Sequence, residues 1–376
     1  MNLGIALLSS LFLAPHAVAA TPLPAPKAAL TVSTVSAKRW TMRVENTGDV
    51  PVRIVADPYL LSLEIMVPAG GDGSSKKAAK AHTVRCSLPA DMRPSSDTSR
   101  GLVLPPGTAY SESFDPRMYC FGARESAGLV RGARVIAHYG FSAPHGAKTK
   151  GAALPPPFVV SPIASAEHPN QASAAPVKEL IGASALELSS DAVASAPNTD
   201  SRSSEQVATR TTTPVSSPIT STISENDPSD PTLSIALPAR SEAARAGDLN
   251  LHVSLTNVGQ RRASVYFRPQ TVAFSVAGPG GEFDCSADNV VAIRELFTTL
   301  SPRGRAQLSV SAANSCPDHS FDLPGLYEVR PRLDTRRVAG SPAGLHAFEG
   351  ETLGTPALVR IRVGKRGILR PSPILE

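Results

Sequence analysis

The chain contains 376 residues, of which 41% are hydrophobic and only 5% aromatic, and its 37 Lys and Arg against 32 Asp and Glu give a formal net charge of +5. The basic residues are dispersed apart from two clusters, residues 74–80 and 359–370. Neither cluster is interleaved with the aromatic residues on which single-stranded bases would stack, which argues against a nucleic-acid-binding protein. The scarcity of aromatic residues also argues against a sugar-binding cleft.

The N-terminus predicts a signal peptide over residues 1–20. An apolar stretch at residues 3–13, too short to span a bilayer, precedes the small residues Ala17 and Ala19, which suit cleavage. It departs from the usual pattern in one respect, since no Lys or Arg precedes it. We expect neither a lipid anchor, because no Cys follows the stretch, nor a membrane span elsewhere. The protein is therefore expected to be exported, to the periplasm or outside the cell.

Two segments 211 residues apart, residues 40–48 and 251–259, share one pattern. Apolar and polar residues alternate in both, which predicts a half-buried strand. Each strand ends in Asn-x-Gly, at Asn46 and Asn257, and this triplet favours a turn. Without a gap, the same offset then matches further apolar, Pro and Gly positions. The chain is therefore expected to contain an internal duplication.

The cysteines follow the same duplication. Each copy has a Cys, then a Pro-Gly-containing turn, then a second Cys, and each closes with an apolar run at residues 158–163 or 357–363. In an exported chain, this order predicts the disulfides Cys86–Cys120 and Cys285–Cys316. A zinc site at Cys316 and His319 is the alternative, but no second ligand pair accompanies it.

Residues 164–232 differ in composition from both copies. They are rich in Ser, Ala, Thr and Pro and poor in aromatic residues, which predicts a disordered linker between a domain at residues 21–163 and another at residues 233–376. Residues 177–190 carry apolar residues near helical spacing. We interpret them as solvated linker, with a transient helix or a docking segment as alternatives. The two domains are expected to move independently.

Motifs with catalytic or cofactor-binding chemistry are not found. A Ser and a His occur together in residues 140–146, but within a Pro/Gly-rich turn rather than a nucleophile elbow. No zinc-protease, phosphate-loop or dinucleotide-binding motif occurs. We therefore predict that the chain is not an enzyme and uses no cofactor or metal.

Short strands, frequent Pro and Gly turns and one Cys pair per copy predict an all-β protein of two immunoglobulin-like antiparallel β-sandwiches. The turn motifs resemble bacterial immunoglobulin-like domains, above all the intracellular-proteinase-inhibitor type. The second copy carries the resemblance through Asn257, Gly259, Leu300, Gly304, Pro324, Gly325 and Tyr327. The first copy lacks the Pro-Gly-x-Tyr element. The resemblance implies protease inhibition, for which an exposed loop at residues 70–81 would be the contact.

The sequence thus favours an exported, non-catalytic binding, adhesion or envelope-assembly module whose partner is a protein or a cell-surface polymer. A secreted protease inhibitor is one alternative, and an envelope enzyme is another. Trp40, the only tryptophan, alternates with Met42 and Val44 on the inward face and is expected in the core. Its alternative role is that of an exposed ligand contact.

Overall fold

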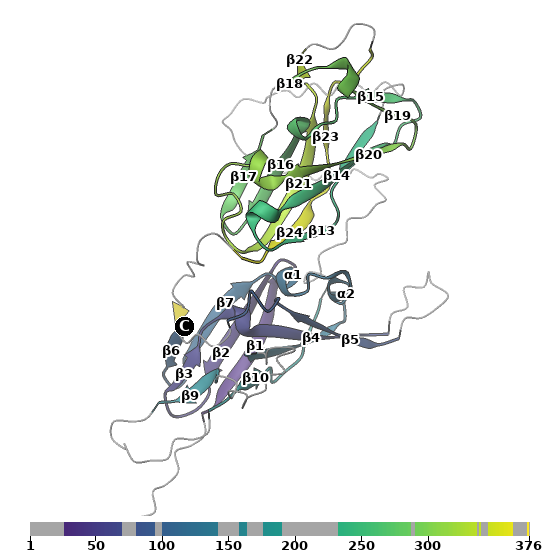
Figure 1. Ribbon diagram of the computed structural model, residues 1–376. Helices are drawn as coiled ribbons and strands as arrows, with labels where there is room; N and C mark the ends of the chain where they lie inside the picture. Colours follow the sequence, from purple (N-terminus) through teal and green to yellow (C-terminus); the bar gives the residue numbers. More distant parts are fainter. Residues whose placement is uncertain are drawn as a thin grey trace, which may run out of the picture.

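The computed structural model describes residues 26–69, 80–94, 100–141, 158–163, 176–189, 232–286, 290–336, 338–339 and 345–363, and the backbone of 374–375. These residues form two β-sandwiches that follow one another along the chain (Figure 1). The predicted all-β, immunoglobulin-like fold is confirmed. The predicted signal peptide and residues 164–175 and 190–231 of the predicted linker lie outside the described ranges.

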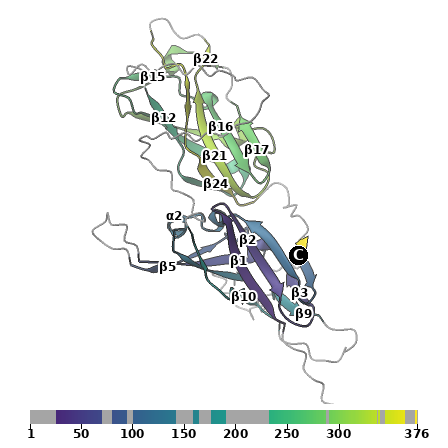
Figure 2. The ribbon, with the colours of Figure 1, turned by 180° about the vertical axis from the view of Figure 1, so that it is seen from behind.

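The first sandwich is built from two main sheets. One contains β1 (Ala28–Ser36), β2 (Arg39–Asn46) and β7 (Ala109–Phe114), with β25 (Ile374–Leu375) at its edge. The other contains β4 (Leu61–Val67), β5 (His82–Ser87), β8 (Arg134–Gly140) and β10 (Glu179–Ile181), and β11 (Leu186–Glu187) also pairs with β8. A small sheet joins β3 (Val52–Val55) to β6 (Gly101–Leu104) and β9 (Val160–Pro162). The short helical segments are η1 (Pro58–Leu60), α1 (Pro116–Tyr119) and α2 (Ala123–Ser126). Seen from behind, β1 and β2 run side by side across this sandwich (Figure 2).

The second sandwich repeats this plan. One sheet contains β12 (Leu233–Ala236), β14 (Asn250–Asn257) and β20 (Arg305–Ser311). The other contains β13 (Arg240–Ala243), β24 (Ala357–Ile361), β21 (Gly325–Asp334), β16 (Val272–Gly278) and β17 (Gly281–Cys285), with β23 (Glu351–Leu353) on β21. Two short pairs are β15 (Ala263–Val265) with β19 (Thr298–Leu300), and β18 (Val290–Val291) with β22 (Val338–Ala339). The helical segments are η3 (Ala246–Asp248), η4 (Pro269–Thr271), η5 (Arg294–Leu296) and α3 (Ala312–Ser315).

Strand pairing in the second sandwich has the immunoglobulin-like pattern. The strand β12 pairs with β14 in one sheet, whereas β13, the next strand, pairs in parallel with β24 in the other sheet. The chain therefore crosses between the two sheets near its entry into the domain. No helix of the described residues has the length and apolar character that a membrane span needs.

The predicted alternation along β2 and β14 decides which of their side chains enter the core. Trp40, Met42 and Val44 are fully buried, while the intervening Thr41 and Arg43 are partly exposed. In β14 the buried residues Leu251, Val253 and Leu255 occupy the equivalent positions. Successive side chains of a strand point to opposite faces, so this pattern directs one face of each strand into the hydrophobic interior.

A buried asparagine ends both strands and makes the same contacts in each sandwich. The Asn46 side-chain amide donates to the carbonyl oxygens of Val50 (2.8 Å) and Leu104 (2.9 Å), and its side-chain oxygen accepts from the Gly48 backbone N–H (3.0 Å). The asparagine thus joins the end of β2 to the turn before β7, which is 58 residues away in the chain.

In the second sandwich, Asn257 donates to Arg261 (2.7 Å) and Leu300 (3.1 Å) and accepts from the Gly259 N–H (3.0 Å). Arg261 and Gly259 lie 211 residues after Val50 and Gly48 of the first sandwich. Leu300, like Leu104, is the last residue of the strand before the second turn. Asn-x-Gly in this chain is therefore more than a turn signal, because its amide satisfies backbone groups of two separate turns.

The first sandwich extends beyond its expected boundary at residue 163. The strands β10 and β11 pair antiparallel with β8, and Leu180 and Leu188 are buried in the core. The interpretation of residues 177–190 as solvated linker is therefore wrong, and the docking alternative holds for residues 177–189. The correspondence between the apolar runs also differs, since β9 pairs with β3, whereas β24 pairs with β21.

We predict that Asn46→Ala lowers the free energy of unfolding of the first sandwich by about 2–4 kcal/mol, because one buried and one partly buried carbonyl oxygen each lose a donor. Urea denaturation followed by the fluorescence of Trp40, the only tryptophan, reports on this sandwich alone. Asn257→Ala is the matched control and should leave the Trp40 transition within about 0.5 kcal/mol of the wild type. An unchanged transition in Asn46→Ala would contradict the role given to this amide.

Candidate functional site

Trp40 lies in the core of the first sandwich and not on its surface. The indole is fully buried and packs edge to face on Phe114, with 6.1 Å between ring centroids. Phe114 in turn packs edge to face on Tyr119 of α1, at 5.3 Å. The structure thus places Trp40 as expected, and its alternative role as an exposed ligand contact does not hold.

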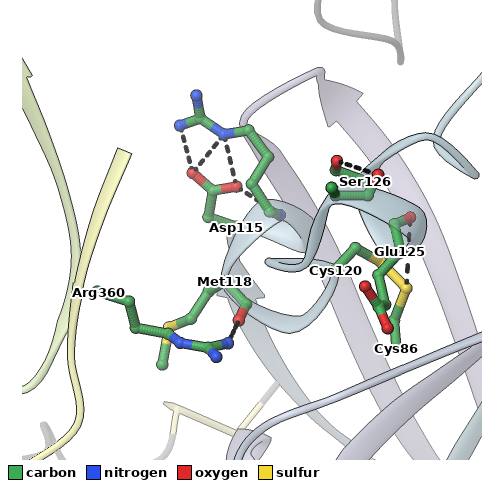
Figure 3. The surroundings of a disulfide bond; sticks show 9 residues. Cys86, Asp115, Met118, Cys120, Glu125, Ser126 and Arg360 are labelled. Carbon is green, nitrogen blue, oxygen red and sulfur yellow. Dashed lines mark hydrogen bonds and ion pairs between the residues drawn. A yellow bond between two sulfur atoms is a disulfide. The ribbon is translucent and has the colours of Figure 1, made fainter. Parts of the chain in front are cut away.

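The cysteines pair as predicted. Cys86, in β5, is bonded to Cys120, which directly follows α1, and Cys285, at the end of β17, is bonded to Cys316, which directly follows α3. The first disulfide thus ties α1 and α2 to the sheet, and the Cys86 sulfur also lies 3.9 Å from the carbonyl oxygen of Glu125 in α2 (Figure 3). We call residues 115–126 the knuckle.

The zinc alternative at Cys316 does not fit this arrangement. Cys316 is committed to the disulfide, and His319 lies 2.6 Å from the Asp322 carboxylate. Within the described ranges, no three side chains of the types that ligate metals gather at one place.

The knuckle is also where the two sandwiches meet. Arg360, in β24 of the second sandwich, is only 7% exposed, and it donates to the carbonyl oxygen of Met118 in α1 (2.9 Å; Figure 3). It also donates to Glu242 of its own sandwich (3.0 Å), and its guanidinium carbon lies 4.3 Å from the centroid of the Phe121 ring. The two terminal nitrogens of this buried guanidinium therefore take their partners from both sandwiches.

A second set of contacts surrounds Glu328, in β21. Its carboxylate lies 2.8 Å from the Lys38 ammonium and 2.7 Å from the Arg117 guanidinium, both from the first sandwich. Arg117 is held by Asp115, 2.6 Å away. Burial alone would raise the pKa of the Glu328 carboxyl, but the hydrogen bonds and charges of Lys38 and Arg117 outweigh burial and lower that pKa below its ordinary value.

A third contact joins Arg362 to Asp91 of the first sandwich, at 2.8 Å. Together these contacts connect the two sandwiches, contrary to the expectation that the two domains move independently. The sequence carried one signal that we did not use: two arginines interrupt the apolar run at residues 357–363. The partners of those arginines are distant in the chain and could not be inferred from the pattern.

An apolar pocket of about 480 Å³, which we call the distal pocket, is lined in part by β18. The strand β18 lies at the end of the second sandwich remote from the first (Figure 1). Its lining residues are Tyr266, Arg268, Pro269, Gln270, Val290, Val291 and Leu296. Val291 is 72% exposed, and the nearby Ile293 is 51% exposed.

The walls of the distal pocket are held by specific contacts. Arg268 donates twice to the carbonyl oxygen of Leu296 (3.1 and 2.9 Å), and Tyr266 packs edge to face on Phe297 (5.1 Å). These contacts hold the walls of the pocket in place without a partner. Apolar side chains lie at the rim of the pocket. Sequence analysis missed this pocket because β18, η4 and η5 come together only in the folded domain.

A second hollow, of about 540 Å³, lies on the outer face of the sheet β12–β14–β20. Its polar lining residues are His252, Ser254, Arg305 and Gln307, and Leu237, Pro238 and Leu308 complete it together with Ala236. The loop at residues 70–81, the expected contact for protease inhibition, lies outside the described ranges apart from Lys80 and Ala81. The same holds for Ser142 and His145 of the Ser- and His-containing turn.

No family model and no curated protein matches the chain. Among solved structures, it is similar to red sea bream transglutaminase at 10% identity and a TM-score of 0.17, over 89% of this chain and 31% of the transglutaminase. It is similar to the CARDB domain of the PF1109 protein from Pyrococcus furiosus, solved in complex with di-metal ions, at 13% identity and a TM-score of 0.17, over 35% of this chain and 94% of that domain. A bacterial adhesin from Mobiluncus mulieris containing intramolecular disulfide, isopeptide and ester bond cross-links matches at 10% identity and a TM-score of 0.13, over 91% of this chain and all (100%) of that chain.

The match to the transglutaminase contradicts the prediction that the chain is not an enzyme, because that neighbour is one, and we withdraw the prediction. The chain spans less than a third of the transglutaminase, and the match assigns no reaction to it. What is established is the class of protein: an all-β chain of two disulfide-containing, immunoglobulin-like sandwiches.

We predict that Trp40→Ala destabilises the first sandwich by about 3–5 kcal/mol, the range for a buried large aromatic residue. Trp40→Phe should cost less, roughly 1–2 kcal/mol, because it keeps a ring against Phe114 and removes an indole N–H that finds no acceptor among the described residues. Urea denaturation followed by circular dichroism measures both variants. A stability of Trp40→Ala equal to that of the wild type would remove Trp40 from the core.

Proposed function

We propose that the chain is an exported binding protein of adhesion type, built from a duplicated immunoglobulin-like domain, and that it holds its partner at the distal pocket. The partner is a protein or a polymer of the cell surface. The matching hydrogen bonds of Asn46 and Asn257 support the duplication. The two disulfides and the N-terminal apolar stretch support export, because disulfides persist in oxidising compartments.

The observation that carries the proposal is the exposure of Val291 and Ile293 beside a pocket whose walls are already held in place. Exposed apolar side chains cost little singly, but next to an apolar hollow they favour association with a partner that covers them. Loops at one end of an immunoglobulin-like sandwich are well suited to such contacts, because the rigid sheets position them.

Binding to intact cells and to cell-wall preparations tests this function. We predict that the double substitution Val291→Asp and Ile293→Asp lowers the amount of purified full-length chain that sediments with them by about tenfold, since desolvating a new charge at such a contact costs at least about 1.4 kcal/mol. Circular dichroism should show that the variant remains folded.

Ile181→Asp is the matched control. Ile181 is 58% exposed and lies on β10 of the first sandwich, far from the distal pocket (Figure 1). Its replacement should leave sedimentation unchanged. Equal binding of the wild type and the double variant would contradict the distal pocket as the contact, and a wild-type chain that binds neither preparation would contradict the function.

A further inference from the structure

The outer face of the sheet β13–β24–β21 carries charges in an ordered arrangement. In the strand register, Glu242 lies opposite Arg360, and Arg360 lies opposite Leu326, two residues before Glu328. Residues two apart share a face, so Glu242, Glu328, Arg360 and Arg362 all point away from the core. The alternate residues Tyr327, Val359 and Ile361 are fully buried on the other face.

The first sandwich offers complementary groups to this face. Lys38 and Arg117 meet Glu328, Asp91 meets Arg362, and the Met118 carbonyl and the Phe121 ring meet Arg360. Positive groups of the first sandwich thus face the Glu328 carboxylate, and negative groups face the guanidinium groups of Arg360 and Arg362. Sliding or rotating one sandwich on the other would bring like charges together, so the pattern selects one orientation.

Of the residues on this face, Arg360 depends most on the first sandwich. A guanidinium that is 7% exposed needs hydrogen bonds and a counter-charge, and its own sandwich supplies Glu242. The Met118 carbonyl and the Phe121 ring come from the other sandwich. Separation of the two would return the Met118 carbonyl and one face of the guanidinium to water.

The disulfide Cys86–Cys120 determines the position of the groups of the first sandwich that contact this face. Arg117, Met118 and Phe121 all lie within three residues of Cys120. The helices α1 and α2 have four residues each, too few to be stable without an external tie. The disulfide supplies that tie to β5, and neither Cys285 nor Cys316 takes part in the contacts between the sandwiches named here.

We propose that the outer face of β13–β24–β21 and the knuckle form a specific docking interface between the two domains of one chain, and that the disulfide Cys86–Cys120 holds the knuckle in the shape that this interface needs. The domain arrangement then depends on the redox state of one disulfide and not of the other. This inference is independent of the function proposed for the distal pocket.

Zero-length carbodiimide coupling of the full-length chain tests the proposal, because it joins an amine to a carboxylate only where the two are in contact. Lys38 and Glu328 are such a pair, and both remain in every variant below. The expected result is a Lys38–Glu328 cross-linked peptide in the monomer, found by mass spectrometry. In an equal mixture of ¹⁴N- and ¹⁵N-labelled chains, the cross-linked peptide should contain one isotope only.

The variants Arg360→Gln and Phe121→Ala should lower the yield of this peptide by at least about fivefold, since each removes a contact of a buried charge. Replacing Cys86 and Cys120 by Ser should do the same. Replacing Cys285 and Cys316 by Ser is the matched control and should leave the yield unchanged. Trp40 fluorescence shows whether the first sandwich stays folded. If the Ser pair unfolds it, the pair Cys86→Val and Cys120→Ala, which keeps apolar side chains at these two buried positions, takes its place.

Absence of the cross-link in the wild type, or an unchanged yield in Arg360→Gln, would overturn the docking interface. A mixed-isotope peptide would overturn its assignment to one chain and make it a contact between copies. Loss of yield in Arg360→Gln without any loss when Cys86–Cys120 is absent in a folded first sandwich would overturn the role of the disulfide.

Discussion

In each sandwich, the side-chain amide of one buried asparagine holds two turns together at the end of an inner strand. Asn46 and Asn257 sit where an inner strand leaves the sheet, and each bonds both its own turn and a turn in a distant part of the chain. Backbone bonds continue the contact, since Gly107 and Arg303 donate to the carbonyl oxygens of the two asparagines. A buried turn without such an amide would leave its carbonyl oxygens unsatisfied, and each unsatisfied carbonyl costs about as much as a lost hydrogen bond.

The strands that cover β8 in the first sandwich and β21 in the second come from different parts of the chain. In the second, β24 covers β21 as part of the same domain. In the first, β8 is covered by β10 and β11, which arrive after residues 164–175, and Leu180 and Leu188 complete the core there. An uncovered β8 would present unpaired backbone groups and exposed apolar side chains, and a strand edge of that kind promotes association. A segment with a linker-like composition can therefore belong to a domain when a few of its residues supply what the sheet lacks.

The second sandwich presents two chemically different surfaces. The outer face of β13–β24–β21 carries charges of both signs that meet the first sandwich, while the remote end carries the apolar distal pocket. Charges give orientation, because a mismatch is costly, whereas apolar contacts supply affinity with less dependence on geometry. This division is consistent with a protein in which one surface sets the arrangement of the domains and the other remains available to a partner.

The sequence by itself determined the β-strands, the repeated turns, the cysteine pairing and the inward position of Trp40. Each of these rests on local or repeated patterns, namely alternation along a strand, Asn-x-Gly, and two cysteines in matching order. Only the tertiary structure decided the partners of Arg360 and Glu328, the distal pocket, and the place of residues 177–189. The contacts of Arg360 and Glu328 with the first sandwich join residues more than 200 positions apart, and the other two features join short elements that are separate in the chain. Their energies depend on distances and burial that no local pattern encodes.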